Sequence, residues 1–347
     1  MDFSYDISAR TVMEEPKIGE ILSAIYRAGV RRMELMGYFY GHMEADAETM
    51  LKARTRLMEA GFSVGAINLP VGHPGNSLNP DDPDLELALP GHWQYRQDED
   101  GREVYYCGCV NEALVRDNRQ AMRDLAQMGF ERVFFDDDLR MGNAGQAIEG
   151  CFCPHCLREF SERLGENISR MQLKACIHQS DAFKNPLVQA WMDYNCQKIV
   201  DFLSKMRTPG IDLGIMVMYK GDRRHGLDIP AMLKVVPDLM IRVGEGHFCD
   251  ADFERPGGKE EIAQSIALHS GLVERKDLLY SESTIFPARA LSKENWIERM
   301  RLEIDCGLRH LFLMSGTWLI EQDYWQALSN ARQELLDRAA RLDEQMN

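Results

Sequence analysis

The segment Ile18–Phe39, IGEILSAIYRAGVRRMELMGYF, joins an amphipathic helix to an apolar strand through a single glycine. The buried face of the helix is indicated by apolar residues at i, i+3, i+4 and i+7, namely Ile18, Ile21, Leu22 and Ile25. Gly29 can adopt the left-handed backbone that ends a helix, and the chain then re-enters the core as a strand. The same junction recurs at Gly61, Gly129, Gly210, Gly271 and Gly307. The repeat predicts helices and strands in alternation.

Eight apolar runs have the length and composition of buried strands. They cover residues 2–8, 32–39, 63–70, 132–138, 213–219, 238–244, 278–283 and 310–316. Helical patterns lie between most of them, so we expect a parallel sheet covered by helices, closed as a (β/α)8 TIM barrel that spans residues 1–347 as one catalytic domain. An open doubly wound sheet is the alternative, but the G-x-G-x-x-G motif expected after its first strand is missing from the sequence.

Two segments exceed what the repeated units need. Residues 71–109 follow the third strand, and residues 141–182 follow the fourth. Both insertions should lie at the carboxyl-terminal face, where barrel enzymes build their active sites. Loops of this length are usually functional or disordered, and the aromatic residues around Trp93 favour an ordered lid over the site.

Composition and charge restrict the class of ligand. The 347 residues are 45% hydrophobic, which is enough for a large core, and the formal charge of −15 disfavours nucleic acid and anionic membranes as partners. A neutral carbohydrate is the substrate class that fits this charge. The amino terminus has no signal-peptide pattern, and no apolar run is long enough to span a bilayer. Because the sequence has no export signal, its nine cysteines are not expected to form a disulfide framework. We therefore expect a cytoplasmic protein. The sequence leaves the oligomeric state open, and the protein could form a homo-oligomer.

Three of the cysteines form a C-x-C-x-x-C motif, Cys151, Cys153 and Cys156, at the start of a predicted helix. Three thiolates at this spacing can converge on one ion, and a tetrahedral structural Zn2+ would need a fourth ligand. Cys107 and Cys109, at the end of the first insertion, are the candidates. Buried thiols that only pack in the core are the alternative interpretation.

The region from Cys109 to Leu164 resembles a known family. A cysteine precedes the segment NEALVR, a helix and a strand ending in acidic residues follow, and then come C-x-C-x-x-C and a helix that begins CLREF. This order is similar to that in the catalytic barrel of glycoside hydrolase family 42 β-galactosidases and their relatives. The resemblance implies a structural zinc beside the active site, held by Cys109, Cys151, Cys153 and Cys156. It also aligns the family's Asn-Glu pair, which contains the general acid/base, with Asp137-Asp138, where this chain carries a shorter carboxylate.

Glycoside hydrolysis requires two carboxyl groups on either side of the scissile bond. In the clan to which family 42 belongs, the acid/base follows the fourth strand and the nucleophile ends the seventh. Carried over, these roles are given to Asp138 and to Glu282, which ends the predicted strand LLYSES. Strand residues alternate faces, so at least one of Asp136, Asp137 and Asp138 must have a structural role. We expect a retaining glycoside hydrolase that acts on a small glycoside or oligosaccharide.

Further residues at strand ends and in the insertions are candidates for binding the substrate. They are Arg10, Tyr38, Trp93, Asp137, Arg140, Tyr219, Glu245 and Trp318. Trp318 offers an indole on which a sugar ring can stack, although ordinary core packing explains it equally well.

Two other classes of function fit the same barrel. A metal-dependent sugar isomerase or epimerase would bind Mn2+, Mg2+ or Zn2+ through Asp138, Glu245, His247 and Glu282. A non-catalytic carbohydrate-binding protein would require that Asp138 and Glu282 do not face each other.

Overall fold

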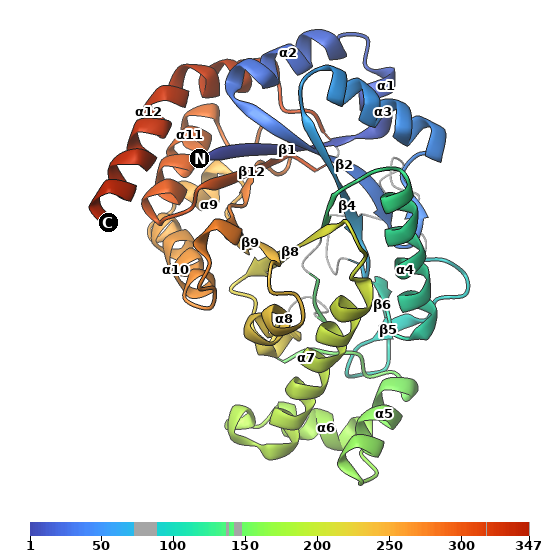
Figure 1. Ribbon diagram of the computed structural model, residues 1–347. Helices are drawn as coiled ribbons and strands as arrows, with labels where there is room; N and C mark the ends of the chain where they lie inside the picture. Colours follow the sequence, from blue (N-terminus) through green and yellow to red (C-terminus); the bar gives the residue numbers. More distant parts are fainter. Residues whose placement is uncertain (73–88, 137–138, 142–147, 317, 347) are drawn as a thin grey trace.

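The computed structural model describes residues 1–72, 89–136, 139–141, 148–316 and 318–346. In it, eight strands form a closed parallel barrel surrounded by helices (Figure 1). The barrel strands are β1 (Asp2–Ser8), β2 (Val30–Phe39), β4 (Ser63–Leu69), β7 (Arg132–Phe135), β8 (Asp212–Tyr219), β9 (Met240–Gly244), β10 (Leu279–Tyr280) and β12 (His310–Met314). They follow one another around the barrel, and β1 pairs with both β12 and β2, which closes it. The predicted TIM barrel is confirmed.

The helices follow the strands in the predicted alternation. They are α1 (Ala9–Glu14), α2 (Ile18–Ala28), α3 (Ala47–Glu59), α4 (Glu112–Gln127), α5 (Pro154–Leu164), α6 (Arg170–Ile177), α7 (Pro186–Met206), α8 (Ile229–Val235), α9 (Asp250–Glu254), α10 (Gly258–Ser270), α11 (Lys293–Asp305) and α12 (Gln322–Met346). Gly29 ends α2 with φ of 105°, as the junction pattern predicts. No helix in the described part of the chain has both the length and the apolar character needed to cross a membrane.

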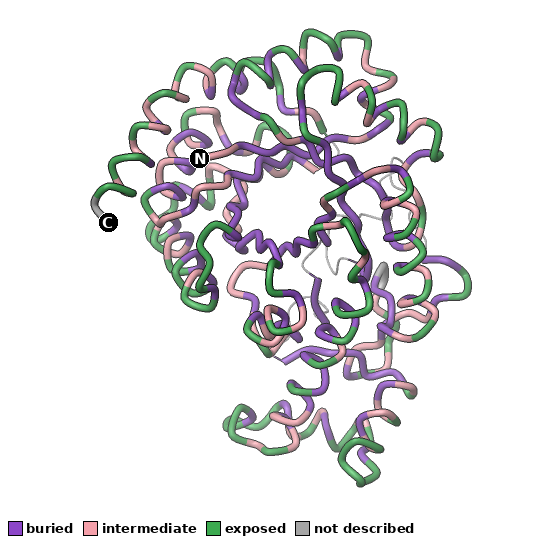
Figure 2. Tube along the Cα trace, viewed as in Figure 1, coloured by how far each residue is buried: buried purple, intermediate pink, exposed green. Residues whose placement is uncertain are grey.

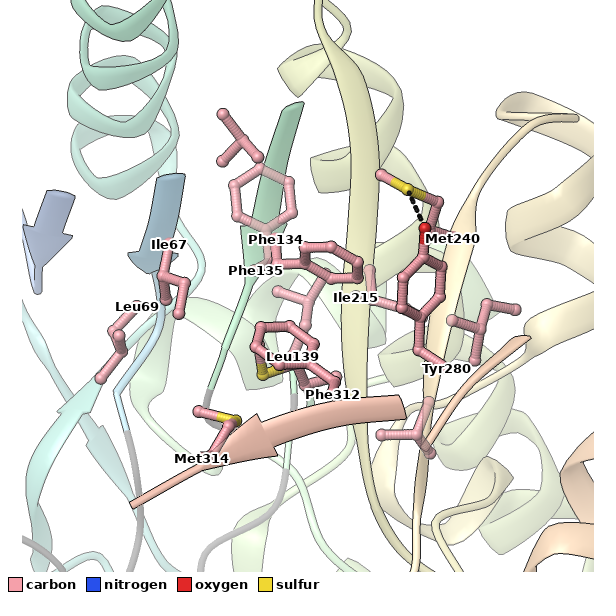
Figure 3. Close-up of a cluster of buried hydrophobic side chains, with 14 of the residues drawn as sticks. Ile67, Leu69, Phe134, Phe135, Leu139, Ile215, Met240, Tyr280, Phe312 and Met314 are labelled. Atoms are coloured by element: carbon pink, nitrogen blue, oxygen red, sulfur yellow. Dashed lines mark hydrogen bonds between the residues drawn. The ribbon is translucent and has the colours of Figure 1, made fainter. Parts of the chain in front are cut away.

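The residues of the barrel strands are mostly buried and form a ring around the barrel axis (Figure 2). Phe134 packs edge-on against Tyr280 and Phe312, each with ring centroids 5.2 Å apart, at the centre of the cluster in Figure 3. A Cβ atom at Gly214 would lie 2.3 Å from the Phe134 ring, so only glycine fits beside it. Below this level Arg132 pairs with Glu34 at 2.8 Å inside the barrel. The core therefore combines an aromatic layer with a paired charge.

The two insertions pack against each other at one edge of the barrel, near α7 (Figure 1). The described part of the first contains a hairpin of β5 (Tyr95–Gln97) and β6 (Glu103–Gly108), and the second contains α5 and α6. Phe152 donates its backbone N–H to the carbonyl of Gln97 at 2.9 Å, and Arg170 donates to the Gln97 side chain at 3.0 Å. The insertions thus form one subdomain.

Candidate active site and cysteine cluster

Glu282 lies between β10 and β11 (Ser283–Thr284), and its side chain is buried. Its Oε2 accepts the backbone N–H groups of Glu245 at 2.5 Å and Gly246 at 2.9 Å, both from the carboxyl end of β9. Its Oε1 accepts the guanidinium of Arg242, which lies on β9. Three donors therefore fix the Glu282 carboxylate at the carboxyl end of the barrel, on the face where active sites of this fold are built.

Arg242 connects Glu282 to the acidic run after β7. Its Nη2 lies 3.7 Å from Oδ1 of Asp136, and the side chains of both residues are largely buried. Asp136 is thus on the inner side of the barrel. Asp137 and Asp138, the next residues in the sequence and two of the predicted site residues, lie outside the described residues.

Asp6 is a third carboxyl group at this level, and the sequence analysis did not select it. It lies on β1, is 1% exposed, and neither carboxylate oxygen has a hydrogen-bond partner among the described residues. Burial, reinforced by the Asp136 carboxylate, raises the pKa of Asp6 well above its usual value. The backbone N–H groups of Asp6 and Ser315 and the guanidinium of Arg242 act against this rise. A signal existed in the sequence: Ser4, Asp6 and Ser8 alternate with apolar residues along the strand.

A buried charge network lies behind Glu282. Arg299 on α11 is fully buried, and its guanidinium lies 3.0 Å from carboxylate oxygens of both Glu245 and Glu303. It also donates to the backbone carbonyls of Gly246 and His247, each at 2.8 Å. We call Glu245, Arg299 and Glu303 the clamp.

The clamp reaches Glu282 through Glu245. Oε1 of Glu245 accepts the backbone N–H of Glu282 at 2.9 Å, while the Glu245 N–H donates back to the Glu282 carboxylate. Burial and then the Glu303 carboxylate raise the pKa of Glu245, and Arg299 counteracts them. Glu245, predicted as a substrate-binding residue, is therefore engaged in holding Glu282.

Four cysteines converge between the two insertions. Each of Cys109, Cys151, Cys153 and Cys156 is buried, and their sulfur atoms all lie within 4.8 Å of one another. Cys109 is 3.7 Å from Cys153 and 3.5 Å from Cys156, sulfur to sulfur. Cys107 is buried but is not part of this group. Four buried thiols at these separations are a donor set that could bind one metal ion.

The metal site expected of a sugar isomerase is not formed by those of its predicted ligands that the structure describes, Glu245, His247 and Glu282. Glu245 is bound by Arg299, and Nε2 of His247 lies 2.9 Å from Arg255 and 3.2 Å from Glu261. Among the described residues, the four cysteines are the only group with the spacing of a metal site.

Two predicted tyrosines point toward the helices. The hydroxyl of Tyr38 donates to Asp124 on α4 at 3.0 Å, and that of Tyr219 donates to Glu261 on α10 at 2.9 Å. In each case the strand register shifts just before the tyrosine, between Met36 and Tyr38 and between Met216 and Tyr219. The structure therefore does not bring either hydroxyl to Glu282.

Other predicted binding residues are dispersed. Arg10 is exposed and lies 3.9 Å from Glu44, and Trp318 is 43% exposed beside Phe286. Arg140 is buried next to Met218 at the end of β8.

Trp93 is 6% exposed and donates its indole N–H to Asp117 on α4 at 2.8 Å. Its ring also packs on the backbone of Gly41 and Gly108, where an added Cβ would lie 2.8 and 3.3 Å from it. Trp93 thus fastens the first insertion to the barrel.

A groove of about 910 Å³ lies outside the barrel, between α4, α5 and α7, and is lined by charged residues of both signs. It does not include Glu282 or Asp136. Because barrel enzymes place their chemistry at the carboxyl ends of the strands, we assign the candidate active site to the Asp136, Arg242 and Glu282 region and not to this groove.

Comparison with known proteins supports the fold. No protein-family model matches the chain, and no curated protein sequence matches it. Among solved structures, the catalytic domain of a β-amylase from Paenibacillus polymyxa is similar with a TM-score of 0.67 and 12% identity, over 97% of this chain and 99% of that one. A family 36 α-galactosidase from Geobacillus stearothermophilus has a TM-score of 0.49 and 14% identity, over 98% of this chain and 42% of that one. A sugar phosphate isomerase/epimerase from Parabacteroides distasonis has a TM-score of 0.43 and 7% identity, over 97% of this chain and 94% of that one. At 12% identity, the likeness to the β-amylase domain shows the barrel fold alone.

Proposed function

We propose that the protein is a retaining glycoside hydrolase that acts on a small neutral glycoside. The observation that carries this proposal is the Glu282 carboxylate, which two backbone N–H groups and Arg242 hold at the carboxyl end of the barrel. Arg242 also lies 3.7 Å from the Asp136 carboxylate. The β-amylase domain, similar over 97% of this chain, has the same barrel fold, and the motif resemblance to family 42 supports glycoside hydrolysis as the class of reaction.

In this proposal Glu282 is the nucleophile. Its carboxylate attacks the anomeric carbon while the bond to the leaving oxygen breaks, and Asp138 gives that oxygen a proton. A water molecule then gives its proton to Asp138, attacks the same carbon and releases Glu282. Arg242 keeps the attacking carboxylate in one orientation, which a near-attack geometry requires.

We propose that the four-cysteine group binds a structural Zn2+. Four thiolates close a tetrahedral site and leave no position for a substrate, so this ion would stabilise the insertions and take no part in turnover. The residues fit the ion: all four sulfur atoms are buried, and Nζ of Lys198 lies 3.8 Å from the Cys156 sulfur, where it offsets negative charge.

The test compares wild-type protein with two variants on a panel of aryl glycosides with good and poor leaving groups. Glu282→Gln keeps the shape of the side chain and should abolish turnover on every member. Asp138→Ala should lose least on activated leaving groups, which need no proton.

Glu274→Gln is the matched control, since Glu274 is exposed and follows α10 on the outside of the barrel. It should behave as wild type. Turnover that survives in Glu282→Gln, or that disappears with chelator and returns with Mn2+, would contradict the proposal.

A further inference from the structure

Asp6 occupies the inner face of β1, at the same level as the candidate active site. In the ladder between β1 and β2 its Cα is paired with that of Glu34, whose carboxylate is taken up by Arg132 at 2.8 Å. The neighbouring Tyr5 points the other way, and its ring packs 4.9 Å from that of Trp325 on α12. Asp6 thus faces the barrel axis.

The charged groups that act on Asp6 are those of the site itself. The Asp136 carboxylate repels its negative charge, and Arg242 attracts it. Arg242 is already paired with Glu282 and lies near Asp136, so it is shared by two other carboxylates. Three carboxyl groups around one guanidinium leave excess negative charge in a buried space, which favours a proton on one of them. Burial and the neighbouring Asp136 carboxylate both raise the pKa of Asp6.

An unpartnered carboxyl group is costly to bury. Both oxygens of Asp6 are enclosed and without a hydrogen-bond partner among the described residues, whereas most buried polar side chains in proteins have one. A leucine has nearly the same shape and would avoid the cost. Because the Asp6 carboxyl group lies buried and unpartnered inside a proposed active site, we expect the bound ligand to supply its hydrogen-bond partner.

We propose that Asp6 is an additional substrate-binding residue of this site, whose buried carboxyl group forms hydrogen bonds with hydroxyl groups of the sugar. This inference rests on the proposed glycosidase function, because it names the ligand of the same site as a neutral sugar. Asp6 would recognise hydroxyl groups of the sugar, while Glu282 acts on the anomeric carbon.

The first experiment measures the protonation state and needs no turnover. Carbon-13 NMR of aspartate-labelled protein, with the Asp6 carboxyl signal assigned by its loss in Asp6→Asn, should show a protonated carboxyl at pH 7. The signal should shift on titration with galactose or glucose as free monosaccharide probes. An ionised Asp6 at pH 7, or a signal that neither sugar moves, would overturn the inference.

The second experiment uses two variants of similar shape. Asn keeps an uncharged donor and acceptor, and Leu keeps neither. Asp6→Asn should lower kcat/KM by about two- to threefold, because the amide can still form hydrogen bonds with the sugar. Asp6→Leu should lower it by about tenfold or more, mainly through KM, because leucine can form none. Both should fold, with melting temperatures no lower than wild type at pH 8. Equal losses in the two variants would mean that an ionised carboxylate is needed, and unchanged KM in Asp6→Leu would mean that Asp6 does not touch the sugar.

The two experiments separate this inference from the glycosidase proposal. Wild-type protein without turnover on the glycoside panel would refute the proposed reaction, and the NMR titration would still decide whether Asp6 is protonated and binds a sugar. Turnover with an unmoved Asp6 signal would refute the inference and leave the reaction in place.

Discussion

Replacing Arg299 by methionine tests the clamp behind Glu282. Methionine keeps an unbranched side chain of similar length but removes the guanidinium that contacts Glu245, Glu303 and two backbone carbonyls. The two carboxylates would remain fully buried without a cation. Glu245 would then no longer hold the backbone N–H of Glu282 in place.

The magnitude follows from complete burial of the pair. Removing one partner of a buried ion pair costs about 3–5 kcal/mol, because the remaining charge has no compensation. Exposed pairs are worth about 0–1 kcal/mol. Arg301, two residues further along α11, is a matched control: it pairs with Glu334 at 3.0 Å but its side chain is 34% exposed. Arg301→Met should therefore cost less than about 1 kcal/mol.

The assay is urea unfolding at pH 5 and pH 8, with kcat measured on the folded protein at each pH. Without Arg299, the pKa of Glu245 rises further, so the native state binds more protons than the unfolded state and stability falls as pH rises. The defect of Arg299→Met should be larger at pH 8 than at pH 5, and kcat should fall more than KM changes. A loss below about 1 kcal/mol, equal to that of Arg301→Met, would refute the view that this network holds Glu282 in place.

Four further outcomes are expected from particular side chains. A four-thiolate site should hold roughly one Zn2+ per chain, and Cys109→Ser should lose this ion and have a lower melting temperature. Cys107→Ser should keep the metal. Equal zinc content in the two variants, measured by atomic emission, would contradict the assignment. Trp93→Ala should cost about 3–5 kcal/mol in urea unfolding, and Trp93→Phe only about 1, because the ring fills a buried space and the N–H makes one hydrogen bond. Asp6→Asn should become more stable than wild type as pH rises above about 4, by up to roughly 1.4 kcal/mol per pH unit, because the pKa of Asp6 is raised on folding. Asp2→Asn, on the same strand, should change stability in the opposite direction, because the hydrogen bond from His310 lowers the pKa of Asp2. The variant should be less stable than wild type at neutral pH, and this difference should disappear as pH falls below the usual aspartate pKa. Stability changes of the same sign in Asp6→Asn and Asp2→Asn would contradict both pKa shifts.

The barrel could be predicted because its signal is local. Apolar runs bounded by glycine stops mark each strand, and all eight predicted runs contain strands of the barrel. The seventh differs in detail: it is divided into β10 and β11, because the N–H of Glu282 bonds to the Glu245 side chain. A tertiary contact of this kind leaves no mark in the periodicity of the strand.

The candidate site was predicted only in part for the same reason. Glu282 could be selected from its position at the end of a predicted strand, and Cys151, Cys153 and Cys156 from their spacing. The spacing left Cys107 and Cys109 open as the fourth ligand, and only the resemblance to family 42 favoured Cys109. Tyr38 follows a register shift that changes the face it occupies, and such shifts depend on the neighbouring strand. Arg299 and Glu303 have the i, i+4 spacing of an exposed helical pair, and only the packing of α11 shows that this pair is buried.

The most direct test of the proposed reaction is covalent trapping. A retaining enzyme forms a glycosyl-enzyme intermediate, which an activated 2-deoxy-2-fluoro glycoside accumulates. Mass spectrometry of protein incubated with such a glycoside, followed by peptide mapping, should show one added sugar on Glu282. A label on another carboxylate, or active protein that is never labelled and releases product of inverted configuration, would contradict the assignment of Glu282 as the nucleophile.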